Sequence, residues 1–324
     1  MTRVIASVLL PAFLLMAGQS ALGGMAKDPG AWLEHMSAAM SQMSYQGTFV
    51  YMYAGQLETV RITHVSDDDG VRERMVSLSG TAREVVRDAN GVHWVLGDEA
   101  SVLSDSAFNR SVFPQLPPDL VSQAGKSYTF KFGSETRIAG HEARNVKVLP
   151  RDHYRYGYSL WLEKNSGILL KWELVDSKRN PLATLMFTEL VLGSEVDRDE
   201  LRVDDRRKGF KTVQSDLPNA ASGPVGEPRS KPGRLPPGFT LINHRYVSGD
   251  DGEYEHLVYS DGLAAVSVYV ESLDRERSHP ELTQKLGTTF AYTRAADGMM
   301  VTVVGNVPES TVEMIGKSVE ADSR

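Results

Sequence analysis

The mature part of the chain opens on a helical pattern of apolar residues. Leu33, Met36 and Met40 recur at intervals of three and four residues, which places them on one face of a helix. Asp28 is suited to cap the first turn, and Pro29 fits the first helical position. We predict an amphipathic helix that packs against a sheet.

A long series of alternating positions follows this helix. Phe49 and Tyr51 share a face with Tyr45 and Tyr53, while the residues between them take the opposite face. Turn-forming residues separate the runs, and Asn90-Gly91 is a strong hairpin signal. The expected strands cover residues 45–53, 57–65, 71–78, 84–87, 92–96, 154–162, 168–174 and 182–191. Many short strands at close spacing predict an antiparallel meander that curls like an unclosed barrel.

Prolines mark the clearest boundary in the chain. Six of the fifteen prolines fall between residues 217 and 238, among glycine, serine and alanine. This composition is typical of an extended linker. We therefore predict a large domain over residues 27–210, a linker over residues 211–237 and a small domain over residues 238–320.

The predicted linker is also basic. Arg229, Lys231 and Arg234 lie close together near its end. One interpretation is a solvated tether whose charges contact nothing. The other is electrostatic contact with an acidic partner or an anionic lipid headgroup, for which these three residues are the candidates.

The residues after the linker predict a small α+β domain. The expected strands cover residues 239–247, 254–259 and 263–271, with a hairpin formed by residues 288–295 and 299–305. A final helix is expected near Pro308, with Val312, Ile315 and Val319 on one face. The chain as a whole is therefore expected to be α+β and mainly antiparallel β.

The first 26 residues have the layout of a secretory signal peptide. Arg3 provides a positive charge, an apolar run extends from Val4 to Met16, and small residues follow. The run is about 13 residues long, short of the roughly 20 that span a bilayer. Cleavage is expected after Gly23 or Ala26, and the mature protein is expected to be exported out of the cytoplasm. An uncleaved membrane anchor is the alternative.

Composition narrows the classes of function. The formal net charge of -7 over 324 residues disfavours a nucleic-acid-binding protein, which usually carries a basic balance. The chain has no cysteine, so disulfides, cysteine nucleophiles and thiolate metal sites are excluded.

A search for catalytic motifs finds none. No two of the eight histidines lie at the spacing of a metal site, and no nucleophile elbow, phosphate-binding loop or dinucleotide fingerprint occurs. We therefore expect a protein that is not an enzyme and that holds no cofactor and no metal.

Apolar and aromatic residues on the predicted strands are the remaining candidates for a site. They could form an ordinary core, or they could line an apolar cleft on the concave side of a curled sheet, where a lipid or peptide would bind. The candidate cleft residues are Phe49, Tyr51, Tyr154, Tyr156, Tyr158, Leu160 and Trp172.

Several short blocks resemble the RseB/MucB family, in the same order and over nearly the whole mature chain. They are Tyr45-Gln46-Gly47-Thr48-Phe49-Val50-Tyr51, Val71-Arg72-Glu73-Arg74, Glu84-Val85-Val86-Arg87, Pro150-Arg151-Asp152-His153-Tyr154-Arg155-Tyr156-Gly157-Tyr158, Leu160-Trp161-Leu162, Lys164-Asn165-Ser166-Gly167 and Leu235-Pro236-Pro237-Gly238-Phe239. Each block is weakly specific, and their combination is what indicates the family.

The resemblance implies a periplasmic negative regulator of an envelope-stress sigma factor. Such proteins have a large domain similar to the lipoprotein carriers LolA and LolB, an unclosed β-barrel, followed by a smaller domain. They bind the periplasmic part of a membrane-spanning anti-sigma factor and shield it from regulated proteolysis, and lipid or lipopolysaccharide is thought to release them. The resemblance supplies no catalytic residues.

Two other interpretations stay open at this point. The same half-barrel could serve a periplasmic lipid or lipoprotein carrier, although a simple carrier needs neither a linker nor a second domain. An exported hydrolase is disfavoured because the catalytic motifs are missing. The sequence also leaves open whether the protein forms a homo-oligomer.

Overall fold

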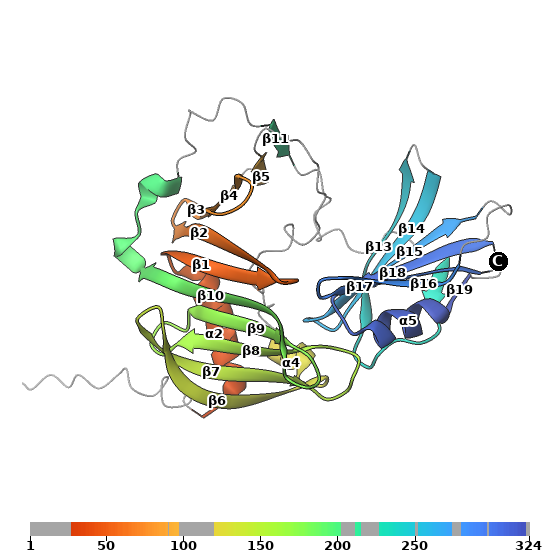
Figure 1. Cartoon of the computed structure of the whole chain (residues 1–324), viewed down its shortest axis with the longest axis horizontal. Coiled ribbons are helices and arrows are strands. Elements are labelled where there is room, and N and C mark those ends of the chain that lie inside the picture. Colours follow the sequence, from red (N-terminus) through yellow and green to blue (C-terminus); the bar gives the residue numbers. More distant parts are fainter. Residues whose placement is uncertain are drawn as a thin grey trace, which may run out of the picture.

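The computed structural model describes residues 27–89, 91–96, 120–201, 211–214, 227–249, 252–273, 280–296 and 298–321. The predicted signal peptide and part of the predicted linker lie outside these residues. Two antiparallel sheets dominate the described chain, one of eleven strands and one of six (Figure 1). We call the large sheet with its helices the large domain and the six-stranded sheet with its helix and flanking strands the small domain.

The large domain begins with the predicted helix, α2 (Pro29–Gln42). The Asp28 carboxylate accepts a hydrogen bond of 2.9 Å from the Gly30 amide, which confirms the predicted cap. Leu33 and Met36 on the apolar face of the helix are fully buried. This helix packs on one face of the large sheet, where its apolar residues and those of the central strands form a single core.

The strands of the large sheet pair in the order β11-β5-β4-β3-β2-β1-β10-β9-β8-β7-β6. Among the described residues no strand joins β11 to β6, so the sheet is unclosed, as predicted. The strands are β1 (Tyr45–Tyr53), β2 (Gln56–Asp67), β3 (Gly70–Ser77), β4 (Arg83–Asp88), β5 (Gly91–Leu96), β6 (Tyr128–Ile138), β7 (His141–Pro150), β8 (Gly157–Glu163), β9 (Leu169–Val175), β10 (Pro181–Leu192) and β11 (Lys211–Gln214). The short helix α4 (Leu120–Ala124) packs against α2.

The structure corrects the predicted strands in several places. Strands β6 and β7 were not predicted, because the exposed second half of β6 is polar and its register shifts between Phe132 and Glu135. Strand β8 begins at Gly157, so Tyr154 and Tyr156 lie in the loop before it and not on the strand. Strand β11 and the short strand β12 (Ser230–Pro232) fall within the stretch predicted as a linker.

Gly47 shows why one family block needs a residue without a side chain. In the pairing of β1 with β10, a Cβ atom at Gly47 would lie 2.4 Å from the Glu189 carbonyl oxygen and 2.8 Å from the Phe187 ring. Real Cβ atoms do not approach this closely, so the backbone of β10 and the buried Phe187 ring pack directly on the glycine.

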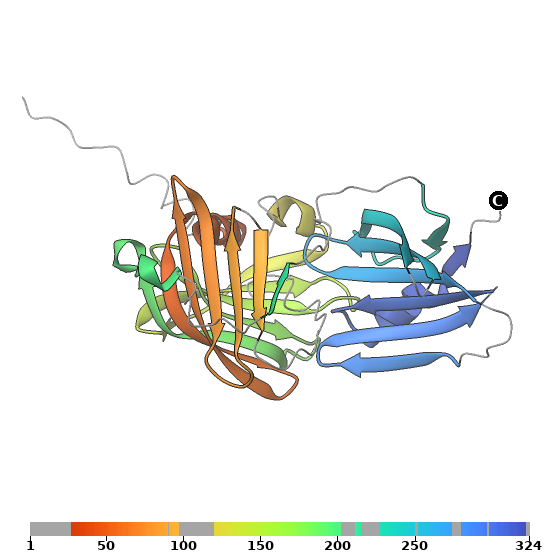
Figure 2. The same ribbon diagram turned by 90° about the horizontal axis from the view of Figure 1, so that it is seen from above.

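The small domain is built on strands ordered β13-β14-β15-β18-β17-β16. Helix α5 (Glu309–Lys317) lies across one face of this sheet (Figure 2) and buries Val312 and Ile315, as predicted. The prediction that Val319 lies on this helix was wrong. Val319 begins a short strand that pairs with β12. The strands are β12 (Ser230–Pro232), β13 (Thr240–Gly249), β14 (Gly252–Ser260), β15 (Ala265–Ser272), β16 (Leu282–Leu286), β17 (Thr289–Ala296), β18 (Met299–Gly305) and β19 (Val319–Ala321).

Candidate functional site

Aromatic side chains gather at the end of the large sheet that faces the small domain. The Tyr51 and Tyr53 rings stack with centroids 6.0 Å apart, and the Trp172 ring lies 6.1 Å from that of Tyr51. Tyr156 and Tyr158 complete the group, which packs on Leu174 and Ala183. We call Tyr51, Tyr53, Tyr156, Tyr158 and Trp172 the aromatic cluster.

The candidate cleft residues divide between the core and this cluster. Phe49 and Leu160 are fully buried in the core. Tyr51, Tyr158 and Trp172 are half-buried and contact both groups. The Trp172 indole N–H is buried and has no hydrogen-bond partner within the described part of the chain. A polar group that is buried in this way is suited to meet an oxygen of a bound molecule.

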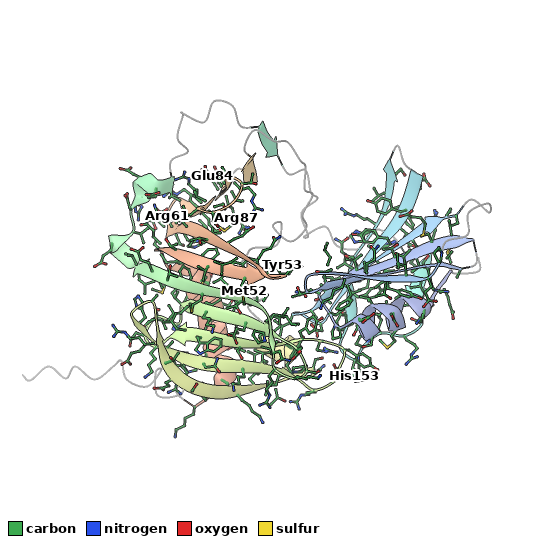
Figure 3. All side chains as sticks on the ribbon, viewed as in Figure 1. Met52, Tyr53, Arg61, Glu84, Arg87 and His153 are labelled. Atoms are coloured by element: carbon green, nitrogen blue, oxygen red, sulfur yellow. The ribbon has the colours of Figure 1, made fainter. Side chains whose placement is uncertain are left out.

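Tyr53 connects the aromatic cluster to the small domain. Its hydroxyl donates a hydrogen bond of 2.9 Å to the Leu286 carbonyl oxygen and accepts one of 3.4 Å from the Thr288 amide. Between them, Gly287 adopts a φ of +64°, and a Cβ atom there would lie 2.3 Å from the Tyr53 ring. Figure 3 shows Tyr53 at the end of β1 that points toward the small domain. The turn between β16 and β17 therefore packs directly on Tyr53 and is hydrogen-bonded to it.

A second contact between the domains is buried and charged. Arg155 bonds to the Asp261 carboxylate through one guanidinium nitrogen and donates to the Pro237 carbonyl oxygen at 2.7 Å through another. Its side chain is 0% exposed and that of Asp261 is 1% exposed. Within the large domain, the Asp152 carboxylate accepts a bond of 3.1 Å from the Arg155 Nε atom. This arrangement compensates both buried charges with partners.

Aromatic rings and an apolar side chain enclose this ion pair. The Arg155 guanidinium carbon lies 5.6 Å from the centroid of the Tyr128 ring and 5.1 Å from that of Phe239. Burial and the nearby Asp261 carboxylate raise the pKa of Tyr128 well above its usual range. Leu263 of the small domain packs against the core of the large one. Arg155 is therefore buried from solvent where the two domains meet. We call this contact of Arg155 with Asp261 and its surroundings the joint.

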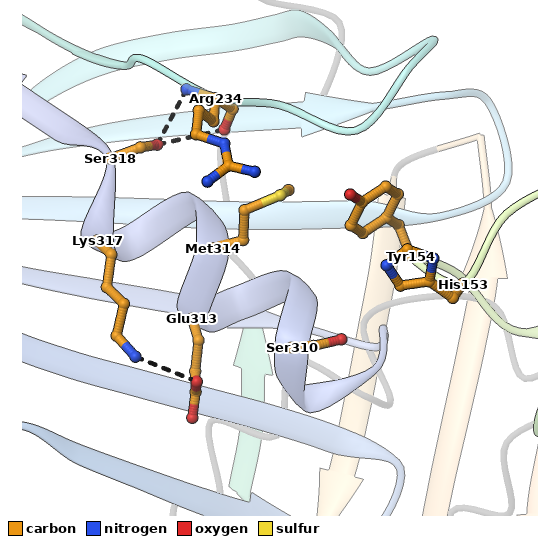
Figure 4. Close-up of a pocket in the computed structure, with 8 residues that line it drawn as sticks. All are labelled: His153, Tyr154, Arg234, Ser310, Glu313, Met314, Lys317 and Ser318. Atoms are coloured by element: carbon orange, nitrogen blue, oxygen red, sulfur yellow. Dashed lines mark hydrogen bonds and ion pairs between the residues drawn. The ribbon is translucent and has the colours of Figure 1, made fainter.

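A pocket opens beside this joint. It has a volume of about 380 Å³ and is bounded by residues of both domains (Figure 4). The Thr311 hydroxyl at the start of α5 donates a hydrogen bond of 2.9 Å to the Tyr154 carbonyl oxygen, which fixes one wall to the other. The lining residues are His153, Tyr154, Arg234, Ser310, Glu313, Met314, Lys317 and Ser318. Tyr154, a candidate cleft residue, thus lies outside the aromatic cluster.

The three basic candidate residues have different surroundings. The Arg229 guanidinium lies over the Tyr246 ring at 4.6 Å, and its amide donates to the Glu255 carboxylate at 2.8 Å. Lys231 is exposed on β12, which pairs with β19. Arg234 lines the pocket. The segment that carries these residues is attached to the small domain.

Arg155, Asp261 and Tyr53 were not among the candidate residues predicted from the sequence. Arg155 nevertheless lies within the central block of the family resemblance, and Asp261 lies in a turn between two predicted strands. The sequence patterns did not predict a buried contact between the two domains.

The described residues contain neither a metal-binding cluster nor a membrane-spanning helix. No group of three histidine, aspartate or glutamate side chains in that part of the chain could hold a metal ion. Helices long and apolar enough to cross a membrane were also not found in the described ranges.

Comparison with known proteins decides the family. A family model described as the MucB/RseB N-terminal domain matches residues 28–204, and a second, the MucB/RseB C-terminal domain, matches residues 227–320. The chain belongs to the MucB/RseB family. The resemblance carried by the short sequence blocks is confirmed, and MucB/RseB proteins are regulatory proteins and not enzymes.

Individual MucB/RseB proteins are similar over almost the full length. The sigma factor AlgU regulatory protein MucB of Pseudomonas aeruginosa is 33% identical over 305 residues, which cover 92% of each chain. A crystal structure of MucB in complex with MucA(peri) covers 92% of this chain and 100% of its own, with 30% identity and a TM-score of 0.73. A complex structure of Pseudomonas aeruginosa MucA/MucB has the same coverage, 31% identity and a TM-score of 0.74.

Proposed function

We propose that this chain is a periplasmic regulator that binds the periplasmic region of a membrane-spanning anti-sigma factor. By shielding that region from regulated proteolysis, it represses the envelope-stress response. The observation that carries this proposal is the likeness, over both domains, to MucB in complex with MucA(peri). The acidic net charge and the missing catalytic motifs are consistent with a binding protein.

The proposal includes the cellular location of the protein and the residue ranges of its two domains. Residues 1–26 would direct export and be removed after Gly23 or Ala26, leaving the mature protein in the periplasm. The large domain would extend over residues 27–210 and the small domain over residues 238–320. Residues 211–237 would connect them, with both of their ends attached to sheets.

We further propose that a lipid or lipopolysaccharide triggers release. An acyl chain would enter the large domain among Tyr51, Tyr158 and Trp172, above the buried Phe49 and Leu160. Support comes from the half-buried aromatic rings and from the indole N–H of Trp172, which lacks a described partner. A ligand drives release only if it binds the released form more tightly than the partner-bound form.

Tyr53 offers a physical route for that coupling. It stacks on Tyr51, which contacts Trp172, and its hydroxyl also bonds to the turn between β16 and β17. A chain that displaces these rings would break the contact with the small domain. Tyr156, in the same cluster, would move with them.

A protease-protection assay tests the proposed function. The periplasmic region of the organism's anti-sigma factor is digested with and without the mature protein, and the mature protein should slow its cleavage. Adding lipopolysaccharide micelles should then restore cleavage, whereas detergent micelles of the same concentration should not. If cleavage proceeds equally with and without the mature protein, the regulator proposal is wrong.

The carrier alternative gives a different result. A lipoprotein carrier would retain lipoproteins from envelope extracts and leave the anti-sigma factor unprotected. The hydrogen bonds between Tyr53 and the small domain argue against this alternative, because a simple carrier needs no second domain in contact with its lipid-binding residues.

A further inference from the structure

The pocket at the joint has two walls from different domains. His153 and Tyr154 of the loop before β8 form one wall, and one side of helix α5 forms the other. Arg234, in the segment that follows β12, lines a third side of the pocket. Figure 4 shows the Arg234 guanidinium and the Met314 thioether directed into the space between these walls.

Among the described residues, the pocket has two permanently charged cations, Lys317 and Arg234, and they differ in their pairing. The Lys317 amine is paired with the Glu281 carboxylate at 3.1 Å and with that of Glu313 at 3.3 Å. No carboxylate in the described part of the chain pairs with the Arg234 guanidinium. Its backbone is held in place, because its amide donates a bond of 3.0 Å to the Ser318 hydroxyl oxygen. A fixed backbone presents the guanidinium at a defined position.

The chemistry of the pocket favours a carboxylate. A guanidinium offers paired donors that match the two oxygens of a carboxylate, and the Ser310 hydroxyl offers a further donor. Met314 and the Tyr154 ring supply apolar contact for a methylene stem or a neighbouring side chain. A phosphate of nearly two negative charges is better matched by several free cations, and Lys317 is already paired.

We propose that this pocket receives an aspartate or glutamate side chain of the partner polypeptide, bound to Arg234. The inference rests on the proposed function, because it assigns a place on this chain to the periplasmic region of the anti-sigma factor. Arg234 and Ser310 belong to the small domain and the Tyr154 wall to the large domain, so the pocket is complete only while the domains are docked. The partner therefore recognises the docked arrangement, and undocking releases it.

Calorimetric titration of the full mature chain with the periplasmic region tests this inference. Arg234→Ala should raise Kd about tenfold or more, and Arg234→Glu should raise it further, because it replaces attraction with repulsion. Arg234→Lys should give an intermediate Kd, since it keeps the charge but not the paired donors. Lys131→Ala is the control, an exposed cation on β6 outside the pocket and outside the basic segment, and should change Kd less than about twofold.

Each outcome has one meaning. If the wild-type chain does not bind the periplasmic region, the proposed function fails. If it binds and Arg234→Ala binds equally well, the pocket assignment is overturned. It is also overturned if Arg234→Ala weakens binding to lipopolysaccharide micelles but not to the polypeptide, because the ligand would then be a lipid headgroup. An unchanged thermal unfolding midpoint for Arg234→Ala shows that the fold is intact.

Discussion

Arg155 of the large domain and Asp261 of the small domain form an ion pair from which water is almost completely excluded. The two residues are 106 positions apart in sequence. Asp261 also accepts hydrogen bonds from the Leu263 and Ala264 amides, at 2.9 and 2.8 Å, which fix it in its turn. The orientation of the domains therefore depends on a charged contact that exists only in the docked state.

Removing the cation should undock the domains. Arg155→Met would leave Asp261 buried without its counter-charge, and breaking a buried pair in this way costs about 3–5 kcal/mol. Separation of the domains relieves that cost by hydrating Asp261. We expect a larger radius of gyration in small-angle scattering and two unfolding transitions in calorimetry in place of one.

The control for this prediction is an ion pair at the surface. Arg198 is paired with Asp67, and its side chain is 62% exposed. Arg198→Ala should change stability by less than about 1 kcal/mol and leave the scattering profile unchanged. Equal scattering profiles for Arg155→Met and the wild type would show that the joint does not depend on the pair.

Two glycines test the contact at Tyr53. Gly287 and Gly298 both occupy turns with positive φ, of +64° and +76°, but only Gly287 faces another side chain. Alanine at either position carries the penalty of a left-handed conformation, about 1–2 kcal/mol. Gly287→Ala should in addition displace the Tyr53 ring and speed hydrogen exchange at the Thr288 amide. The two variants should differ in this exchange rate. Equal rates would contradict the packing of the turn between β16 and β17 on Tyr53.

The hydroxyl of Tyr53 can be tested without disturbing its ring. Tyr53→Phe removes both hydrogen bonds to the turn between β16 and β17 and should weaken docking by about 1 kcal/mol. Tyr156→Phe, in the same cluster, serves as the comparison. Hydrogen exchange at the Thr288 amide should accelerate only in Tyr53→Phe. If both variants behave like the wild type, Tyr53 does not couple the cluster to the small domain.

His256 should make the small domain sensitive to acid. Burial and the nearby Arg245 cation lower its pKa to about 4, whereas a histidine in an unfolded chain titrates near about 6.5. Between these values the unfolded chain binds the proton and the folded one does not. Stability is therefore complete above about pH 6.5 and decreases as the pH falls toward 4, by on the order of 1–3 kcal/mol.

A substitution at His256 separates this effect from general acid unfolding. The His256 ring stacks on Tyr269 with centroids 4.4 Å apart, so His256→Phe preserves the aromatic contact and removes the proton site. Its unfolding free energy should vary less than that of the wild type between pH 6.5 and 4. His153→Phe, at an exposed histidine, should follow the wild-type profile. A His256→Phe profile that is as steep as the wild type would assign the effect to other groups.

The sequence predicted correctly those elements that are determined by residues close together in the chain. The cap at Asp28, the alternating face of β1 and the hairpin of β17 and β18 each follow from neighbouring residues, and all three were predicted correctly. Strand β6 escaped prediction because its outer half is polar and its pairing is bulged. The pairing of β12 with β19 joins residues about ninety positions apart and leaves no local signal.

The residues of the candidate site were harder to predict from the sequence than the strands and helices. The aromatic stripe was recognised, but alternation could not tell that Phe49 lies in the core while Tyr51 keeps some exposed surface. The alternating tyrosines predicted that a strand begins at Tyr154, but residues 154–156 lie in the loop before β8. This loop carries Arg155 into the joint, and that role depends on a partner from the other domain.

The central claim is that the mature chain binds the periplasmic region of a MucA-type anti-sigma factor. Isothermal titration of that region into the purified mature chain, with both proteins from the same organism, measures this directly. We predict saturable binding at a fixed stoichiometry, weakened in Arg155→Met because the domains no longer stay docked. Heat signals that never saturate would contradict the claim, and so would equal affinity for the region and for an unrelated periplasmic polypeptide of the same charge.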